Sequence, residues 1–164
     1  MLQVLWVTCA VVVVTAAVRS RRHPNAPLLG RIGVGVLFLA AGAAVNAFFL
    51  ARGDDYAEFA SGSYLAFVRD TWTTVVVPNH DVWIGLLILF EVAVGVLALL
   101  GARRTQLAYV AAIAFHAALL SFGWGFYLWS LPMIAAIGTL LQAERRASRA
   151  AADVIALPAH AEAA

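Results

Sequence analysis

The chain has 164 residues, of which 63% are hydrophobic and only 12% are charged, and its mean hydropathy is +0.88. A soluble domain is about half apolar and about a quarter charged, so this composition excludes an ordinary soluble protein and predicts an integral membrane protein. The formal net charge is only +2, and short arginine clusters separate apolar runs, a pattern typical of membrane topology and not of nucleic-acid binding. We therefore expect a lipid bilayer as the environment and no nucleic-acid partner.

Five apolar runs approach the length of about 20 residues that a helix needs to cross a bilayer. They cover residues 2–18, 32–51, 82–101, 107–122 and 126–142. Residues 52–81 interleave acidic and aromatic side chains, as short helices at a membrane interface do. The predicted fold class is therefore all-α: a polytopic membrane helix bundle of five transmembrane helices, with short interfacial helices in residues 52–81.

The arginines set the expected orientation. Nine of the eleven fall in residues 19–31, 102–106 and 143–164. These arginine-rich segments alternate along the chain with the arginine-poor connections between the apolar runs. Cytoplasmic loops of membrane proteins are rich in Lys and Arg, so we expect the N-terminus outside and the C-terminus in the cytoplasm. The absence of lysine and the abundance of alanine indicate a bacterial genome, and hence the bacterial cytoplasmic membrane.

Four regions follow from this pattern. Residues 1–18 are expected to form an N-terminal transmembrane helix, and residues 19–31 a basic cytoplasmic connector interrupted by two prolines. Residues 32–142 would form a four-helix membrane unit. Residues 143–164, which are rich in alanine and follow the last apolar run, are expected to be a disordered cytoplasmic tail.

Three polar residues fall inside the apolar runs. Glu91 and His116 lie near the middle of neighbouring antiparallel helices, and Asn46 lies on the small-residue side of the second run. Ionisable groups at this depth are rare and usually face the interior of a bundle. A Glu91–His116 pair, joined by Asn46, would satisfy these groups. Such a pair could fix helix register, relay protons or bind a quinone head group, or ligate a metal or haem.

A second polar group precedes the third run. His80 and Asp81 are two weak candidates for metal ligands, fewer than a zinc site needs. Asn79 or Asp81 would serve equally as the N-cap of the following helix, which we consider the better interpretation. The P-loop, GxSxG, HExxH and dinucleotide-binding motifs are all absent from the sequence, so it supports no soluble type of catalysis and leaves enzymatic activity undecided.

Two groups of residues resemble the motifs of a known family. The first group is Arg31 and, in the second run that follows it, Gly35, Leu37, Phe38, Ala41 and Gly42. The second group is Glu91, Gly95, Leu97, Leu99 and Gly101 of the third run, with Arg103 just after it. Together with Pro132 in a closing helix, they resemble the DoxX-like family of small four-helix bacterial membrane proteins. The resemblance covers residues 31–142 and makes residues 2–18 an extra helix. That family often has a lysine shortly after the first motif, where this chain has Asn46.

The resemblance implies a function in membrane redox chemistry, since the family includes a subunit of a thiosulfate–quinone oxidoreductase. We therefore expect an accessory subunit of a membrane redox system, with a quinone or proton site formed by Glu91, His116 and Asn46 and with quinone as the candidate cofactor. Its partner would be a membrane or extracytoplasmic redox protein, or a second copy of the chain. Two alternatives are a structural or assembly protein that docks a partner through residues 52–81, and a small oligomeric transporter module.

Overall fold

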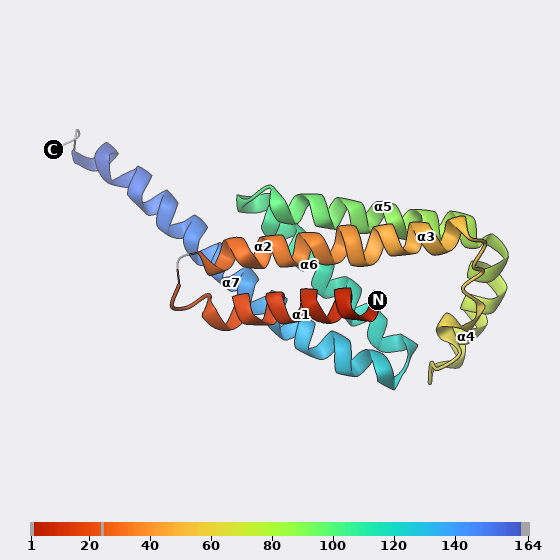
Figure 1. The fold of residues 1–164 in the computed structure, drawn as a ribbon. Coiled ribbons are helices and arrows are strands. Elements are labelled where there is room, and N and C mark those ends of the chain that lie inside the picture. Colours follow the sequence, from red (N-terminus) through yellow and green to blue (C-terminus); the bar gives the residue numbers. More distant parts are fainter. Residues whose placement is uncertain (1, 24, 162–164) are drawn as a thin grey trace.

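The computed structural model describes residues 2–23 and 25–161, and within these ranges the regular structure is entirely helical (Figure 1). The α-helices are α1 (Leu2–Arg19), α2 (Ala26–Val36), α3 (Val45–Ala51), α4 (Ala66–Thr71), α5 (His80–Leu99), α6 (Ala102–Leu119) and α7 (Trp124–Ala161). Two π-helical segments, η1 (Leu37–Ala44) and η3 (Trp72–Val76), and three short 3₁₀ turns, η2 (Ala57–Ala60), η4 (Val77–Asn79) and η5 (Leu120–Phe122), connect them. The all-α prediction is confirmed.

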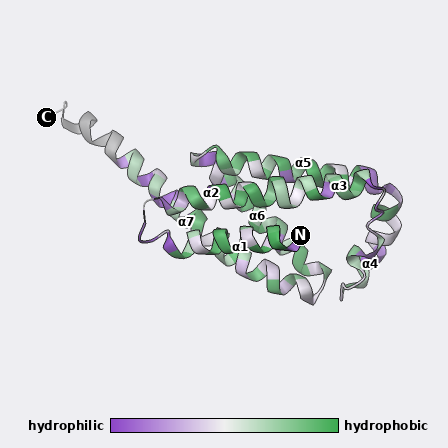
Figure 2. Ribbon diagram, in the orientation of Figure 1, coloured by the Kyte–Doolittle hydropathy of each residue, from purple (hydrophilic) through white to green (hydrophobic). Residues whose placement is uncertain are grey.

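Four continuous helical stretches are long and apolar enough to cross a membrane: Ala26–Ala51, Ala66–Leu99, Ala102–Phe122 and Trp124–Asp153. Residues Gln3–Arg19 form a shorter apolar helix. Apolar residues cover the length of the bundle, and polar residues gather at its two ends (Figure 2). The protein is therefore a multi-pass membrane protein.

The helices alternate in direction, so their connections meet at two opposite ends (Figure 1). One end holds the α1–α2 connector, the α5–α6 turn and the part of α7 that runs past the other helices. Nine of the eleven arginines lie in these segments or in the helical turns next to them, and we call this end of the bundle the arginine end. The other end holds the beginning of α1, the 52–81 segment and the α6–α7 turn.

The basic connector is shorter than the sequence predicts, because α2 begins at Ala26 and not at residue 32. Pro27 lies in the first turn of α2, where a helix needs no backbone N–H from it. The expectation of a connector that extends to residue 31 is therefore wrong. Arg31 instead lies inside a helix that packs against the rest of the bundle.

The helix that carries Glu91 also begins earlier than expected. Ala66–Leu99 is one continuous helical stretch, in which Pro78 is accommodated within η4. Asn79 occupies the N-cap position of α5, but its side chain makes no capping bond, and its Nδ2 donates to the Val75 carbonyl at 3.0 Å. The predicted side-chain capping bond from Asn79 is therefore not made, and Asp81 lies in the first turn of α5.

Over residues 143–161, where the sequence analysis expects a disordered tail, the structure has a helix, because α7 continues to Ala161. Alanine and arginine are among the strongest helix formers, and they dominate this part of the chain. Glu144 supplies a further reason, since its side chain is buried against the bundle. Residues 162–164 of the expected tail lie outside the described residues.

Small residues allow α2, η1 and α5 to approach closely. A Cβ atom added at Gly95 of α5 would lie 2.5 Å from Cγ of Leu39 and 3.2 Å from the Gly35 carbonyl oxygen. Side chains at these glycines would therefore push the two helices apart. This contact brings Glu91, one turn before Gly95, against the π-helical segment η1.

Candidate functional site

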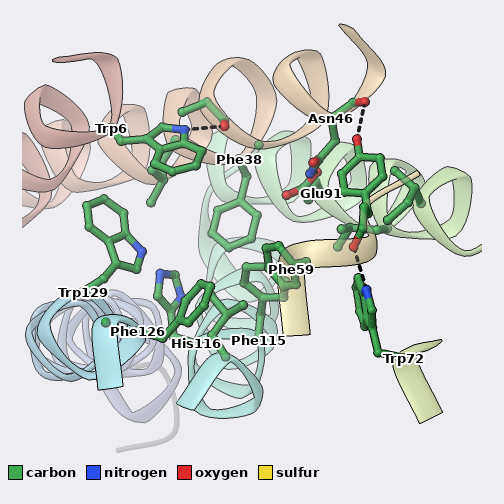
Figure 3. Close-up of a pocket in the computed structure, with 18 residues that line it drawn as sticks. Trp6, Phe38, Asn46, Phe59, Trp72, Glu91, Phe115, His116, Phe126 and Trp129 are labelled. Atoms are coloured by element: carbon green, nitrogen blue, oxygen red, sulfur yellow. Dashed lines mark hydrogen bonds between the residues drawn. The ribbon is translucent and has the colours of Figure 1, made fainter. Parts of the chain in front are cut away.

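A cavity of about 460 Å³ lies between α1, η1, α5, α6 and α7 on the side nearer the 52–81 segment. Its walls are mostly aromatic and aliphatic side chains, among them Phe38, Phe115, Phe126 and Trp129 (Figure 3). All three intramembrane polar residues singled out from the sequence, Glu91, His116 and Asn46, line it. An apolar cavity with a few convergent polar groups is the usual form of a small-molecule site.

Glu91 contributes a carboxyl group from α5 and is only 3% exposed. Its Oε2 accepts a hydrogen bond from Asn46 Nδ2 at 2.9 Å. Its Oε1 lies against the backbone of η1, where a Cβ added at Gly42 would be 2.6 Å away. The lack of a side chain at Gly42 therefore gives the carboxyl group its place, and Asn46 holds its orientation.

His116 reaches the same cavity from α6 and is 2% exposed. Its Nδ1 donates a hydrogen bond to the Ala112 carbonyl at 2.8 Å, because a carbonyl oxygen can only accept. In the neutral imidazole Nε2 is then an acceptor, and no protein hydrogen bond to it occurs among the described residues. His116 thus offers one free acceptor to the cavity.

The expected Glu91–His116 hydrogen bond does not form in the described part of the chain. The Phe38 ring lies between the two side chains in Figure 3, and its centroid is 6.1 Å from that of the His116 ring. Each polar group has its own local partner instead, Asn46 for Glu91 and the Ala112 carbonyl for His116. The structure therefore places both groups on one cavity but leaves the space between them to aromatic rings.

The 52–81 segment covers one side of the cavity. Tyr56 donates from its hydroxyl to the Asn46 carbonyl at 2.9 Å, and Trp72 Nε1 donates to the Tyr56 carbonyl at 2.8 Å. Phe59 stacks on Trp72 with ring centroids 5.1 Å apart. This covering part, residues 56–72, links α3 to the cavity wall, and we call it the strap.

The strap is also fastened to the α6–α7 turn. Ser63 Oγ donates to the Ser121 carbonyl at 2.5 Å, and Phe59 packs edge-on against Phe122 with centroids 5.0 Å apart. Tyr56 itself has a φ of +58°, a left-handed conformation that is unusual for a tyrosine. The strap's position is therefore set by specific contacts with α3 on one side and with the α6–α7 turn on the other.

The first helix, expected to stand outside the four-helix unit, packs on α2 and α7 and contributes to the cavity wall. Trp6 Nε1 donates to the Ala41 carbonyl within η1 at 2.6 Å, and the Trp6 ring lies 6.4 Å from that of Trp129. π-Helical turns often occur at functional sites. The π-helical segment η1 supplies both the Ala41 carbonyl that accepts from Trp6 and the space at Gly42 that the Glu91 carboxyl group occupies.

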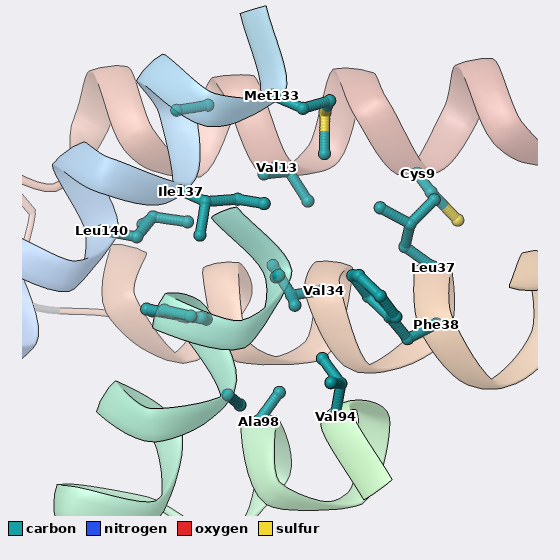
Figure 4. Close-up of a cluster of buried hydrophobic side chains, with 14 of the residues drawn as sticks. Cys9, Val13, Val34, Leu37, Phe38, Val94, Ala98, Met133, Ile137 and Leu140 are labelled. Carbon is teal, nitrogen blue, oxygen red and sulfur yellow. The ribbon is translucent and has the colours of Figure 1, made fainter. Parts of the chain in front are cut away.

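Toward the arginine end the helices enclose a packed hydrophobic core. Val13, Val34 and Ile137 are fully buried, and Cys9 and Met133 join the same cluster (Figure 4). Leu37 and Phe38 belong both to this cluster and to the cavity lining, so the core forms one wall of the cavity. The cavity therefore lies on the side of the core away from the arginines.

His80 and Asp81 do not line the cavity. The His80 Nε2 atom lies 3.5 Å from Asp81 Oδ1, and the Asp81 side chain is 82% exposed. No group of three or more metal-ligating side chains occurs in residues 2–23 and 25–161. This pair therefore does not by itself provide the coordination of a zinc site.

The structure adds two features that the sequence reasoning missed. Tyr56 lines the cavity, and its only signal in the sequence is an aromatic residue among acidic ones. Arg31 binds Glu144 bidentately, with Nε and Nη2 each 2.7 Å from a carboxylate oxygen. Glu144 is the one acidic residue between the last apolar run and the arginines that follow it, which is a signal for a buried partner.

No family model, curated protein or solved structure matches this chain. The likeness of residues 31–142 to the DoxX-like family therefore stays a prediction from the motifs.

Proposed function

We propose that this protein is an accessory subunit of a membrane redox system and that its cavity binds the head group of a lipid-soluble quinone. The observation that carries the proposal is the position of the Glu91 carboxyl and the His116 Nε2 atom on one aromatic cavity. A quinone ring is flat and its faces are apolar, so it can pack against the aromatic and aliphatic walls of the cavity. Its oxygens need hydrogen-bonding groups at the edge, which these two residues offer.

The chemistry of the two groups suits both redox states. Quinone carbonyls accept hydrogen bonds, and a protonated Glu91 would donate one. Hydroquinone hydroxyls donate, and a carboxylate or the neutral Nε2 of His116 would accept. Oxidation of a hydroquinone releases two electrons and two protons. In this proposal a partner redox protein takes up the electrons, the Glu91 carboxylate accepts one proton and Nε2 of the neutral His116 accepts the other.

A titration with decylubiquinone tests the binding site. Trp6 and Trp129 line the cavity, so bound quinone should quench tryptophan fluorescence of the protein in a mild detergent. Glu91→Gln and His116→Phe should each weaken binding roughly tenfold or more, because the first replaces the ionisable carboxyl group by an amide and the second removes the Nε2 acceptor of the desolvated site. Leu89→Ala, on an exposed position of the same helix as Glu91, serves as the control and should bind as the unaltered protein does.

Equal quenching of all four proteins would contradict the proposed site. A loss in the Leu89→Ala control as large as in Glu91→Gln would mean that the variants act through folding of the bundle. The His116→Phe result is decisive for the hydrogen bond, since phenylalanine conserves a flat aromatic ring but removes the Nε2 acceptor.

The same proposal includes the orientation and the first span. The arginine end would face the cytoplasm of a bacterial cell, since positive residues are retained on that side. The strap would then lie outside the membrane, where an extracytoplasmic redox protein could reach it. Helix α1 would cross as a fifth span, with Trp6 near the outer surface.

A partner-docking function is favoured by one observation on the 52–81 segment. Tyr64 and Phe67 are 66% and 78% exposed, respectively. Exposed aromatic side chains are common in protein interfaces and at membrane surfaces. In an accessory subunit these residues would contact the redox partner. In a purely structural protein, docking of a partner through these two residues would be the only function, and quinone would not bind.

A further inference from the structure

A second pocket lies at the arginine end, between the α1–α2 connector and α7. It is an open pocket of about 610 Å³, lined by Ser20, Arg21, Arg22 and His23 of the connector and by Arg146 of α7, with small apolar residues completing it. It shares no residue with the cavity that holds Glu91. A ligand bound in this pocket would therefore contact none of the residues that line the proposed quinone site.

The connector is a tight turn, which fixes where its cations lie. The backbone amides of Arg22 and His23 both donate to the Arg19 carbonyl, at 2.9 and 3.0 Å, and Ala26 N donates to the His23 carbonyl at 3.2 Å. These bonds hold the base of the arginine cluster against the end of α1. The arginine side chains stay exposed, so they are free to bind an external group.

No carboxylate lines this pocket. Glu144, two residues before Arg146, is the acidic residue that could have neutralised it. Both oxygens of Glu144 are instead engaged by Arg31, and the residue is 1% exposed. Three arginines thus converge on one pocket without an anionic neighbour among its lining residues, which is an arrangement that recognises phosphate.

The surroundings of the pocket indicate the source of that phosphate. Val18 and Leu28, which flank the connector in the sequence, are 74% and 56% exposed. In a membrane protein such apolar side chains face acyl chains, and the arginines beside them face the head groups. We propose that this pocket binds the phosphate of an anionic phospholipid whose acyl chains lie along α1 and α2.

Native mass spectrometry of the purified full chain in a mild non-ionic detergent tests this site. The probes are phosphatidylglycerol and phosphatidylcholine with the same acyl chains. The pocket variant is Arg21→Gln/Arg22→Gln/Arg146→Gln. The matched control is Arg103→Gln/Arg104→Gln/Arg149→Gln, which removes the same charge from exposed positions at the same end that do not line the pocket.

The unaltered chain and the matched control should retain phosphatidylglycerol in preference to phosphatidylcholine. The pocket variant should hold phosphatidylglycerol roughly 100-fold more weakly, because three phosphate contacts are lost. An equal loss in both variants would overturn the proposal in favour of general surface charge. Displacement of the lipid by inorganic phosphate at the same concentration would overturn it in favour of a soluble phosphate ligand.

Discussion

Replacing Arg31 by leucine should lower the free energy of unfolding by about 3–5 kcal/mol, the largest stability effect expected for any single change in this chain. Glu144 is almost fully buried, and both of its carboxylate oxygens are bonded by the Arg31 guanidinium at 2.7 Å. Without Arg31 the carboxyl group would be left in the bundle with no cation. Thermal unfolding in detergent, followed by circular dichroism, measures the loss.

A double-variant cycle separates the ion pair from general packing. Arg31→Leu/Glu144→Leu should recover most of the stability, since two apolar side chains replace the pair and no buried charge is left. Arg103→Leu, at an exposed position of the same end, is the control and should change stability little. A single Arg31→Leu variant as stable as the unaltered protein would contradict the assigned role of this pair.

Replacing Gly123 by alanine should detach the strap from the α6–α7 turn and cost about 3 kcal/mol. Gly123 has a φ of +125°, a conformation that alanine adopts only with strain. Its added Cβ would also meet the Gly62 backbone, 2.9 Å from the carbonyl carbon and closer still to the oxygen. A backbone segment cannot relieve such a contact by changing a rotamer, so the strap itself must move.

Two measurements follow that movement. Trp72 should become more exposed, with a red shift of its fluorescence in a chain whose other tryptophans are replaced by phenylalanine, and decylubiquinone should bind more weakly because the strap covers the cavity. Gly138→Ala is the matched control, since its Cβ would have no neighbour within 4 Å and the residue does not line the cavity. If Gly123→Ala and Gly138→Ala gave the same spectra and affinities, the strap would not depend on this contact.

Much of the fold could be predicted from the sequence, because apolar length and the spacing of arginines act locally. The third and fourth runs, predicted at residues 82–101 and 107–122, correspond to α5 (His80–Leu99) and α6 (Ala102–Leu119). The depth of Glu91 and His116 also follows from counting along these helices. Both residues do lie on one cavity. Four of the five predicted spans correspond to helices long and apolar enough to cross a membrane, and the first corresponds to the shorter apolar helix Gln3–Arg19.

The details of the site could not be predicted, because they depend on distances between helices. Periodicity indicates which face of a helix is buried, but it does not show that Phe38 lies between Glu91 and His116. The π-helical segment η1 has no distinct sequence signature, yet its Gly42 gives the carboxyl group its place. The Arg31–Glu144 pair joins residues 113 positions apart, which no local pattern connects.

The measurement that tests the central proposal most directly is the quinone content of the protein purified from its own membranes in a mild detergent. We expect stoichiometric amounts of quinone in the extracts of the unaltered protein and of Leu89→Ala. Quinone should be absent from Glu91→Gln/His116→Phe, which should keep the same helical content. A folded, unaltered protein that carries no quinone and binds no added decylubiquinone would contradict the proposed site, and so would a double variant that retains its quinone in full.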